Sequence, residues 1–255
     1  MAQVTLKAAE GIAVLSVDRP EALNALNREI VDQMDELIDQ VAADDSVRCL
    51  VIHSDKNFAA GADIKAMAEC DEEGAKVFAF SPTYNKITKL SVPTIAAIEG
   101  YALGGGMELA LTADIRIAGK SAKMGFPEVT LGIFPGAGGT IRAPKLIGPA
   151  LAKEMIFTGD AIKADRALAI GLVNRVVEDD QVLEEAMKLA KRIAKRGPVA
   201  VRMVKDVINR GLEEPDVIKG TEIEAEQWAK LFNTYDQKEG MKAFMEKRKP
   251  TFQNR

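Results

Sequence analysis

The sequence is poor in the side chains that most often carry metal and nucleophilic chemistry. Among 255 residues there is one histidine, His53, and there are two cysteines, Cys49 and Cys70. Zinc sites usually combine several histidine and cysteine ligands, and the chain has no C-x-x-C or H-x-x-x-H pair. A Ser-His-Asp triad would have to use His53, and no G-x-S-x-G turn surrounds any serine. We therefore expect chemistry that uses carboxylates, hydroxyls, lysines or backbone groups, without a metal.

The chain also lacks a large charge excess and a long apolar run. Its 34 Lys and Arg against 38 Asp and Glu give a formal net charge of −4, which offers no global reason to bind nucleic acid. The most apolar stretch, residues 92–113, is interrupted by Glu99 and Glu108, which argues against a membrane span. The first residues lack the apolar core of a secretory signal, and two unpaired cysteines suit a reducing compartment. We expect a cytoplasmic protein that binds neither nucleic acid nor a membrane.

Strand and helix patterns alternate early in the chain, and helical patterns dominate later. Residue alternation predicts a hairpin from residues 4–7 and 12–17, and short apolar runs predict strands over 48–53 and 94–98. Helices are expected after an Asn27 cap up to Val41 and over 72–90, 182–194, 199–208, 222–232 and 238–244. This order indicates an α/β core followed by a helical C-terminal region.

Glycine is concentrated between residues 100 and 140, which hold ten of the 20 glycines. Such density marks tight turns and close approaches of the backbone. A dinucleotide motif G-x-G-x-x-G is incomplete, because the required glycines are replaced by Leu109 and Ile141. A phosphate loop is equally incomplete, because Gly119-Lys120-Ser121 follows Asp114 where the opening glycine should be. The glycines therefore indicate a site of another kind.

Two segments each join a turn of small residues to the start of a predicted helix. They are residues 58–65, FAAGADIK, and residues 100–110, GYALGGGMELA. Helix N-termini leave backbone N–H groups without partners and carry partial positive charge. Two such termini facing one point would form an oxyanion hole from main-chain amides, and Ala62 and Gly105 are small enough to admit an acyl oxygen.

Two glutamates lie close to this frame in the sequence. Glu108 follows the glycines by one helical turn, and Glu128 ends the segment GFPE, which begins another helical stretch. Two carboxyl groups can divide acid and base work when their environments separate their pKa values. Spacing alone leaves open whether the two converge, and either one alone is compatible with an ordinary charge at a helix N-terminus.

These segments resemble the enoyl-CoA hydratase (crotonase) family. Residues 95–118, IAAIEGYALGGGMELALTADIRIA, are similar to its signature segment, and FAAGADIK, FPEVTLGIFPGAGGT and AFMEKRK also match in order along essentially the whole chain. The resemblance implies an α/β fold, a crotonase-like spiral of ββα repeats with C-terminal helices that build trimers, which commonly pair into hexamers. It assigns residues 1–195 to the spiral core with the CoA thioester site. It assigns residues 196–255 to oligomerisation and part of the CoA site.

The resemblance further implies a hydro-lyase of fatty acid metabolism and beta-oxidation. Such an enzyme reversibly adds water to a 2-trans-enoyl-CoA and gives a 3-hydroxyacyl-CoA. The thioester oxygen would bind the amides of Ala62 and Gly105, Glu108 would be the base that orients water, and Glu128 the acid toward the α-carbon. Both glutamate positions typical of the family's hydratases are filled. No cofactor is implied, because coenzyme A is part of the substrate.

Contacts with coenzyme A are implied by the same resemblance. The matching positions are Ala60, Asp63, Ile64 and Lys65 in one loop, and Phe244 and Lys247, which would reach from a neighbouring subunit. Phe126 replaces the glutamine that hydratases of the family often have, and beside the pocket it would make the site more apolar.

Other functions remain open on the sequence. A double-bond isomerase, or a pathway-specific hydratase or dehydratase, would use the same scaffold. A non-catalytic member would be expected to lose a glutamate or to block the oxyanion turn, and neither is seen. A serine protease of related fold is disfavoured, because the chain lacks a Ser-His arrangement.

Overall fold

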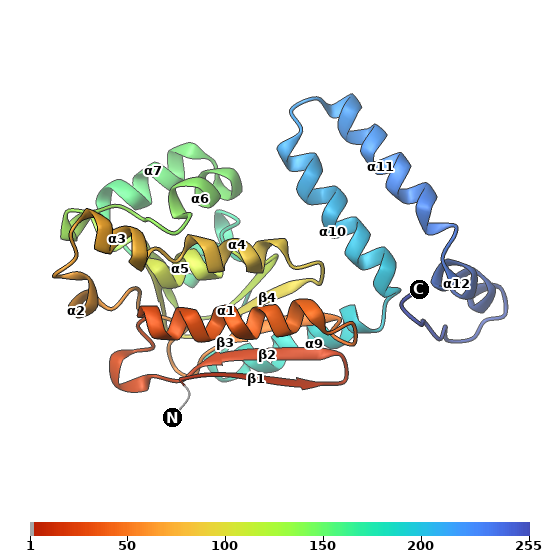
Figure 1. The fold of residues 1–255 in the computed structure, drawn as a ribbon, viewed down its shortest axis with the longest axis horizontal. Coiled ribbons are helices and arrows are strands. Elements are labelled where there is room, and N and C mark those ends of the chain that lie inside the picture. Colours follow the sequence, from red (N-terminus) through yellow and green to blue (C-terminus); the bar gives the residue numbers. More distant parts are fainter. Residues whose placement is uncertain (1–2) are drawn as a thin grey trace.

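A computed structural model describes residues 3–255 and shows an α/β core that continues into the helices α10 to α12 (Figure 1). Met1 and Ala2, with which the predicted core begins, lie outside the described residues. The strands are β1 Val4–Ala9, β2 Ile12–Val17, β3 Cys49–His53, β4 Thr94–Ile98, β5 Tyr101–Leu103, β6 Ile115–Gly119, β7 Lys123–Gly125, β8 Ile162–Lys163 and β9 Arg175–Val177. The helices are α1 Arg28–Ala43, α2 Ile64–Met67, α3 Glu72–Phe78, α4 Ser81–Lys89, α5 Gly105–Ala110, α6 Gly139–Ile147, α7 Pro149–Thr158, α8 Ala164–Ala169, α9 Val182–Ala194, α10 Pro198–Glu213, α11 Val217–Leu231 and α12 Tyr235–Met245.

The strands form two sheets that share a repeating unit. The larger sheet has six strands in the order β1-β2-β3-β4-β6-β9, parallel except for the β1–β2 hairpin, and the smaller has the order β5-β7-β8. The consecutive pairs β4/β5 and β6/β7 each place one strand in each sheet before the chain turns into a helix. This arrangement confirms the predicted α/β spiral of ββα units.

The central strands are buried on both faces, which explains their continuous apolar runs. Leu50 and Ile52 of β3 point into the main core with α1 and α4, whereas Cys49 and Val51 point to α9 on the other side. The predicted hairpin, the Asn27 cap and the helix over 182–194 are confirmed. Asn27 Oδ1 accepts the Ile30 N–H at 2.9 Å.

The predicted single helix over residues 72–90 is wrong, because the chain forms α3 and α4 separated at Ala79. Ala79 has extended torsion angles (φ −57°, ψ 129°), and Pro82 lies in the first turn of α4. Proline has no N–H to donate, and its ring clashes with the carbonyl of the preceding turn, so one continuous helix is disfavoured there. The break allows α4 to begin a new direction over the glycine-rich segment.

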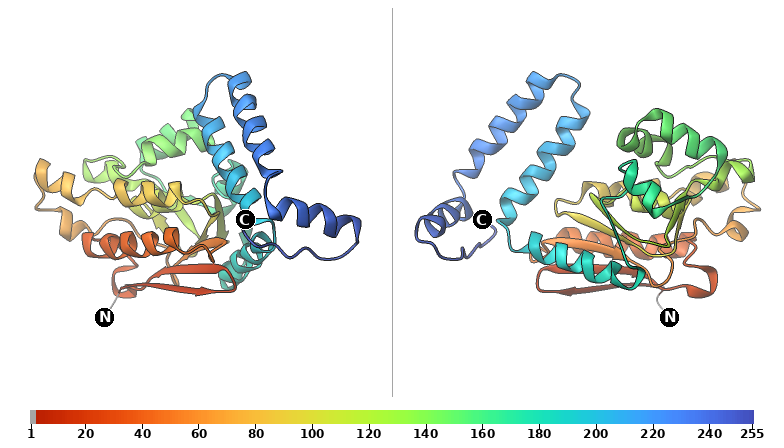
Figure 2. Two further views of the ribbon diagram at one scale, coloured as in Figure 1. Left: turned by 45° about the vertical axis from the view of Figure 1, so that its right-hand side comes forward. Right: turned by 180° about the vertical axis from the view of Figure 1, so that it is seen from behind.

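The C-terminal helices extend away from the core (Figures 1 and 2). The pair α10 and α11 forms a long hairpin, and both helices are longer than predicted. Helix α11 begins earlier than predicted, directly after Asp216. The Asp216 side chain caps it by accepting the N–H groups of Ile218 and Lys219. The buried Lys205 side chain ties α10 to the core through Asp114 at 2.7 Å and the Val92 carbonyl at 2.9 Å.

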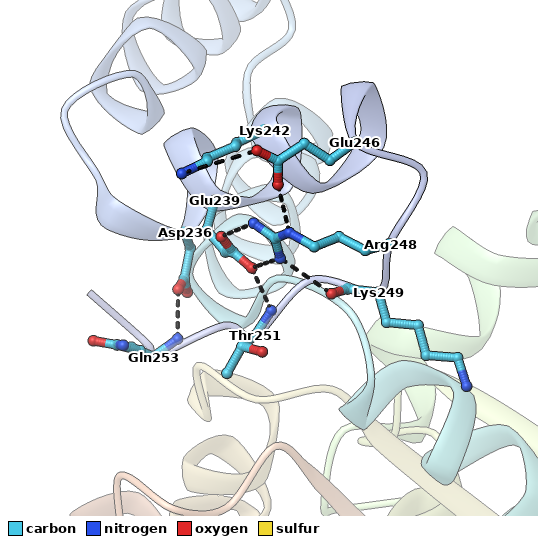
Figure 3. Close-up of polar contacts among 8 residues, drawn as sticks. All are labelled: Asp236, Glu239, Lys242, Glu246, Arg248, Lys249, Thr251 and Gln253. Atoms are coloured by element: carbon cyan, nitrogen blue, oxygen red, sulfur yellow. Dashed lines mark hydrogen bonds and ion pairs between the residues drawn. The ribbon is translucent and has the colours of Figure 1, made fainter.

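The terminal residues fold back onto α12 and are fastened by two buried carboxylates (Figure 3). Glu239 accepts the Thr251 N–H at 2.7 Å and a two-armed contact from Arg248 at 2.6 and 2.8 Å. Asp236 accepts the Gln253 N–H at 2.6 Å. Because these acceptors replace the water that the tail amides would otherwise bind, the tail has a defined path along α12.

Candidate active site

Glu108 is a buried carboxylate that is oriented by backbone amides. It lies on α5, its side chain is almost inaccessible (3% exposed), and its Oε1 accepts the N–H groups of Ala137 at 2.7 Å and Gly139 at 2.8 Å. These donors belong to the turn of residues 137–139 that precedes α6. Two N–H groups that donate to the same oxygen fix the orientation of the carboxylate, and Oε2 accepts neither of them.

Glu128 lies beside the glycine turn at Gly104. It lies in a short 3-10 helix, Pro127–Leu131, and its Oε1 is 2.9 Å from the position that a Cβ of Gly104 would occupy. Gly104 has φ +49°, a torsion that side chains rarely tolerate. Within residues 3–255 the buried Glu128 Oε2 has no hydrogen-bond partner. The structure thus places Glu128 against Gly104, next to the start of the helix that carries Glu108, and close enough for the Glu108 charge to act on it; the sequence spacing had left this open.

The two carboxyl groups have different electrostatic surroundings. Burial raises the pKa of Glu108, while the Gly139 and Ala137 N–H groups and the Arg142 charge oppose that shift. Burial raises the pKa of Glu128 to about 7; its own backbone N–H opposes the shift and the Glu108 charge adds to it. A carboxyl group of this pKa holds a proton near neutral pH, which suits an acid, whereas a carboxylate with amide donors suits a base.

The raised pKa of Glu128 predicts a pH-dependent stability cost. The ionised carboxylate is disfavoured in the folded protein, so the cost is absent below the ordinary value of 4.5, grows as the pH rises and is complete above about 7. We expect Glu128→Gln to unfold in urea with a free energy about 2 kcal/mol higher than the wild type at pH 8, allowing for partial exposure. At pH 4.5 the two proteins should be equal. A gain of the same size at both pH values would show that ionisation is not the cause.

Two backbone amides meet beside these carboxylates. A Cβ built on Gly105, the first residue of α5, would lie 3.6 Å from the Ala62 nitrogen. The neighbouring peptide groups are occupied, since Leu26 N–H donates to the Gly61 carbonyl and Asp63 N–H to the Leu26 carbonyl. In the described part of the chain, neither the Ala62 nor the Gly105 N–H donates to a protein acceptor. Adjacent backbone donors without a protein acceptor are the groups from which an oxyanion hole is built.

The two amides are held together by a close contact between their segments. Ala59 pairs with Ala102 in a parallel bridge, and Gly106 packs so tightly on the Ala59 carbonyl that any Cβ would overlap it. The buried Tyr84 hydroxyl donates to the Gly105 carbonyl at 2.8 Å and fixes the first turn of α5 from above. These contacts hold residues 59–62 close to the start of α5.

The predicted CoA-contacting residues divide into two groups. Ala60, Asp63, Ile64 and Lys65 flank Ala62 in the structure, where Asp63 caps α2 and pairs with Arg19 at 2.8 Å, and Ile64 and Lys65 are exposed. Phe244 and Lys247 lie on or just after α12, exposed, at the opposite end of the molecule from α2 (Figures 1 and 2). One chain therefore does not bring these two groups together.

Phe126 is completely buried and supports the Glu108 contact. An ideal Cβ on Gly139 would lie 2.9 Å from Phe126 Cε1 and 3.1 Å from Glu108 Cγ. The ring packs against the turn whose amides bind Glu108. The role of that turn, residues 137–139, was not predicted from the sequence, although the pattern GAGG at residues 136–139 marks where backbone amides can approach a side chain.

The residues excluded by the sequence are in unreactive surroundings. Cys49 is buried, and burial raises the pKa of its thiol to about 12, which disfavours the nucleophilic thiolate. The buried His53 contacts Asp55 at 3.1 Å. Over residues 3–255, no group of three or more His, Cys, Asp or Glu side chains is placed to hold a metal ion. None of the described helices is both long and apolar enough for a bilayer.

Comparison with known proteins identifies the family of this chain. A sequence model of the enoyl-CoA hydratase/isomerase family matches residues 7–255. This chain belongs to that family. It is 44% identical to a crotonyl-CoA hydratase of Syntrophomonas wolfei, over 98% of this chain and 97% of the relative. It is 43% identical to a short-chain-enoyl-CoA hydratase of Clostridium acetobutylicum, over 96% and 95% of the two chains.

The fold of the hydratase/isomerase family is equally clear in three dimensions. A crystal structure of an enoyl-CoA hydratase from Bacillus anthracis superposes with a TM-score of 0.95 and 36% identity, covering 99% of this chain and 100% of that one. The predicted family is therefore confirmed, and so is its spiral fold with C-terminal helices.

Proposed function

We propose that this protein is an enoyl-CoA hydratase that uses Glu108, Glu128 and the amides of Ala62 and Gly105 to add water to a 2-trans-enoyl-CoA. One observation carries the proposal: in the described residues, the buried Glu108 and the half-buried Glu128 have different electrostatic surroundings and lie near two backbone N–H groups that have no protein acceptor. The full-length similarity to proteins named as hydratases supports the same assignment.

The proposed reaction balances with these four groups. The thioester oxygen accepts the N–H groups of Ala62 and Gly105, which stabilise the negative charge that develops when Cβ is attacked. The Glu108 carboxylate takes a proton from water, and the water oxygen forms a bond to Cβ. The protonated Glu128 gives its proton to Cα. Hydration leaves Glu108 neutral and Glu128 ionised, and exchange with solvent restores the starting state; dehydration is the reverse.

We extend the proposal to short acyl chains and to fatty acid beta-oxidation. The two relatives named for crotonyl-CoA and short-chain enoyl-CoA support the chain length. The reaction needs no cofactor beyond the coenzyme A of the substrate. A cytoplasmic location belongs to the same proposal, and the two free cysteines are compatible with it.

A homo-oligomer, a trimer or a hexamer, is also part of the proposal. Apolar side chains that are largely exposed in the single chain gather on the last helices, namely Val204, Ile208, Leu212, Val217, Ile218, Trp228 and Phe244. An apolar surface of this kind is typical of a protein interface. We propose that residues 196–255 form it, and that Phe244 and Lys247 of one subunit thereby contact coenzyme A bound next to residues 60–65 of another.

The direct test is hydration of 2-enoyl-CoAs of increasing length. We expect purified protein to remove the absorbance of the conjugated thioester, fastest with crotonyl-CoA and more slowly with longer chains. Faster loss with long chains would contradict the short-chain assignment. No loss with any chain length would contradict the hydratase assignment itself.

A further inference from the structure

The turn that binds Glu108 is itself held by one arginine. Arg142 lies on α6, and its Nη1 donates to the Ala137 carbonyl at 3.0 Å. The N–H of the same residue, Ala137, donates to Glu108 at 2.7 Å. The guanidinium also covers Gly138 so closely that a Cβ there would overlap Nη1. Arg142 thus occupies the face of the 137–139 turn that is not used by Glu108.

The second arm of Arg142 reaches the helix that holds the oxyanion turn. Nη2 donates to Asn85 Oδ1 at 2.7 Å and to Thr88 Oγ1 at 3.4 Å, both on α4. The residue before Asn85, Tyr84, donates to the Gly105 carbonyl at 2.8 Å. One helix therefore touches both halves of the site: Gly105 directly, and the turn that orients Glu108 through Arg142.

Arg142 forms no ion pair within the described residues. In the part of the chain that the structure describes, no carboxylate lies within 4.0 Å of its guanidinium, and its hydrogen-bond partners are neutral oxygens. Its charge acts instead on the site: it lowers the pKa of Glu108 against the effect of burial.

We propose that Arg142 is a positioning residue for Glu108, fixing the 137–139 turn from α4 so that the N–H groups of that turn face the Glu108 carboxylate. This inference rests on the proposed role of Glu108 as the base. A planar guanidinium suits the position, because two separate N–H arms serve Ala137 and α4 at once. Lysine would keep the charge but could not make both contacts with one ammonium group.

The proposal predicts a particular change in the pH dependence of turnover. The titratable groups facing Arg142 are Glu108 on α5 and Tyr84 on α4, with Glu128 acting through Glu108. Burial raises the pKa of Tyr84 well above its usual value, so that hydroxyl stays neutral. Loss of the Arg142 charge should therefore raise the pKa of Glu108, and the acid limb of kcat should move to higher pH.

The test compares Arg142→Met with Arg142→Lys in crotonyl-CoA hydration across pH. We expect R142M to lose about 10- to 100-fold in kcat with KM within about twofold, and its acid limb to move up by about one pH unit. R142K should keep the wild-type acid limb and recover part of kcat. R142M with wild-type kcat and pH profile would overturn the proposal. So would a change confined to KM.

Two further variants separate the possible causes. Asn85→Ala removes the shorter of the two Nη2 contacts with α4 and leaves the 3.4 Å contact with Thr88. It should lower kcat severalfold without moving the acid limb, and it serves if R142M does not fold. Unchanged kcat in N85A would contradict the link to α4. Glu108→Gln is measured alongside. If E108Q retains turnover, the assignment of Glu108 as the base fails. If E108Q loses turnover and R142M does not, only the role proposed for Arg142 is refuted.

Discussion

Replacement of Glu108 by glutamine is expected to reduce kcat for crotonyl-CoA hydration at least about 100-fold. The amide oxygen of glutamine can still accept the N–H groups of Ala137 and Gly139, so the turn and the fold should survive. What is lost is the ability to take a proton from water, and general acid–base groups contribute about 10²- to 10⁴-fold to rate. The decay of the conjugated thioester absorbance at saturating substrate measures the effect.

Glu99→Gln is the matched control for this experiment. Burial also raises the pKa of Glu99, but its carboxyl group lies beside His53 and not at the glycine turn. Turnover in E99Q should stay within about twofold of the wild type. Near-normal kcat in E108Q would refute the role of Glu108, and an equal loss in E99Q would show that any buried glutamate in this region matters for folding.

Gly106→Ala is expected to damage the candidate site severely although it adds only one methyl group. Its Cβ would overlap the backbone carbonyl of Ala59, which cannot move aside as a flexible side chain can. Helix α5 would have to shift away from residues 59–62, and the Gly105 and Ala62 amides would separate. Losing one oxyanion donor typically costs about 3 kcal/mol of transition-state stabilisation, so we expect at least a 100-fold loss of kcat/KM. Overpacking should also cost about 1–3 kcal/mol of stability.

Gly220→Ala provides the control for the change of glycine to alanine. Gly220 lies on α11, and nothing in the described residues is within 4 Å of its Cβ position. Alanine is the better helix former by about 1 kcal/mol, so G220A should be active and at least as stable as the wild type. A G106A protein with wild-type kcat/KM would contradict the proposed coupling between the two amide-bearing segments.

Much of the fold is predictable because its signals are local. The Asn27 cap, the amphipathic pattern of α9 and the apolar run of β3 each specify an element within a few residues. The break between α3 and α4 occurs at Ala79 and Phe80, just before Pro82, within a stretch whose composition is otherwise compatible with a helix. Helices α11 and α12 begin before the apolar patterns from which they were predicted. Their first residues follow the capping side chains of Asp216 and Thr234.

The candidate site was predictable in its parts but not in its assembly. Small residues at Ala62 and Gly105 indicated where amides could bind an oxygen, and both glutamates could be singled out. Their convergence depends on the two-sheet spiral, because β5 and β7 bring the Gly104 turn and Glu128 side by side. Glu108 binds the 137–139 turn through backbone N–H groups. Every residue except proline has such a group, so the only sign of this contact in the sequence is the high glycine content of the turn.

The central claim is that this site adds water across the double bond rather than moving it. Hydration of crotonyl-CoA in D₂O enriched in ¹⁸O-labelled water tests this directly by mass spectrometry and NMR. We expect 3-hydroxybutyryl-CoA with ¹⁸O at C3 and one deuterium at C2 in the wild type, and neither label in E108Q over the same time. Deuterium incorporation with a shifted double bond and no ¹⁸O in the wild type would contradict it and indicate an isomerase.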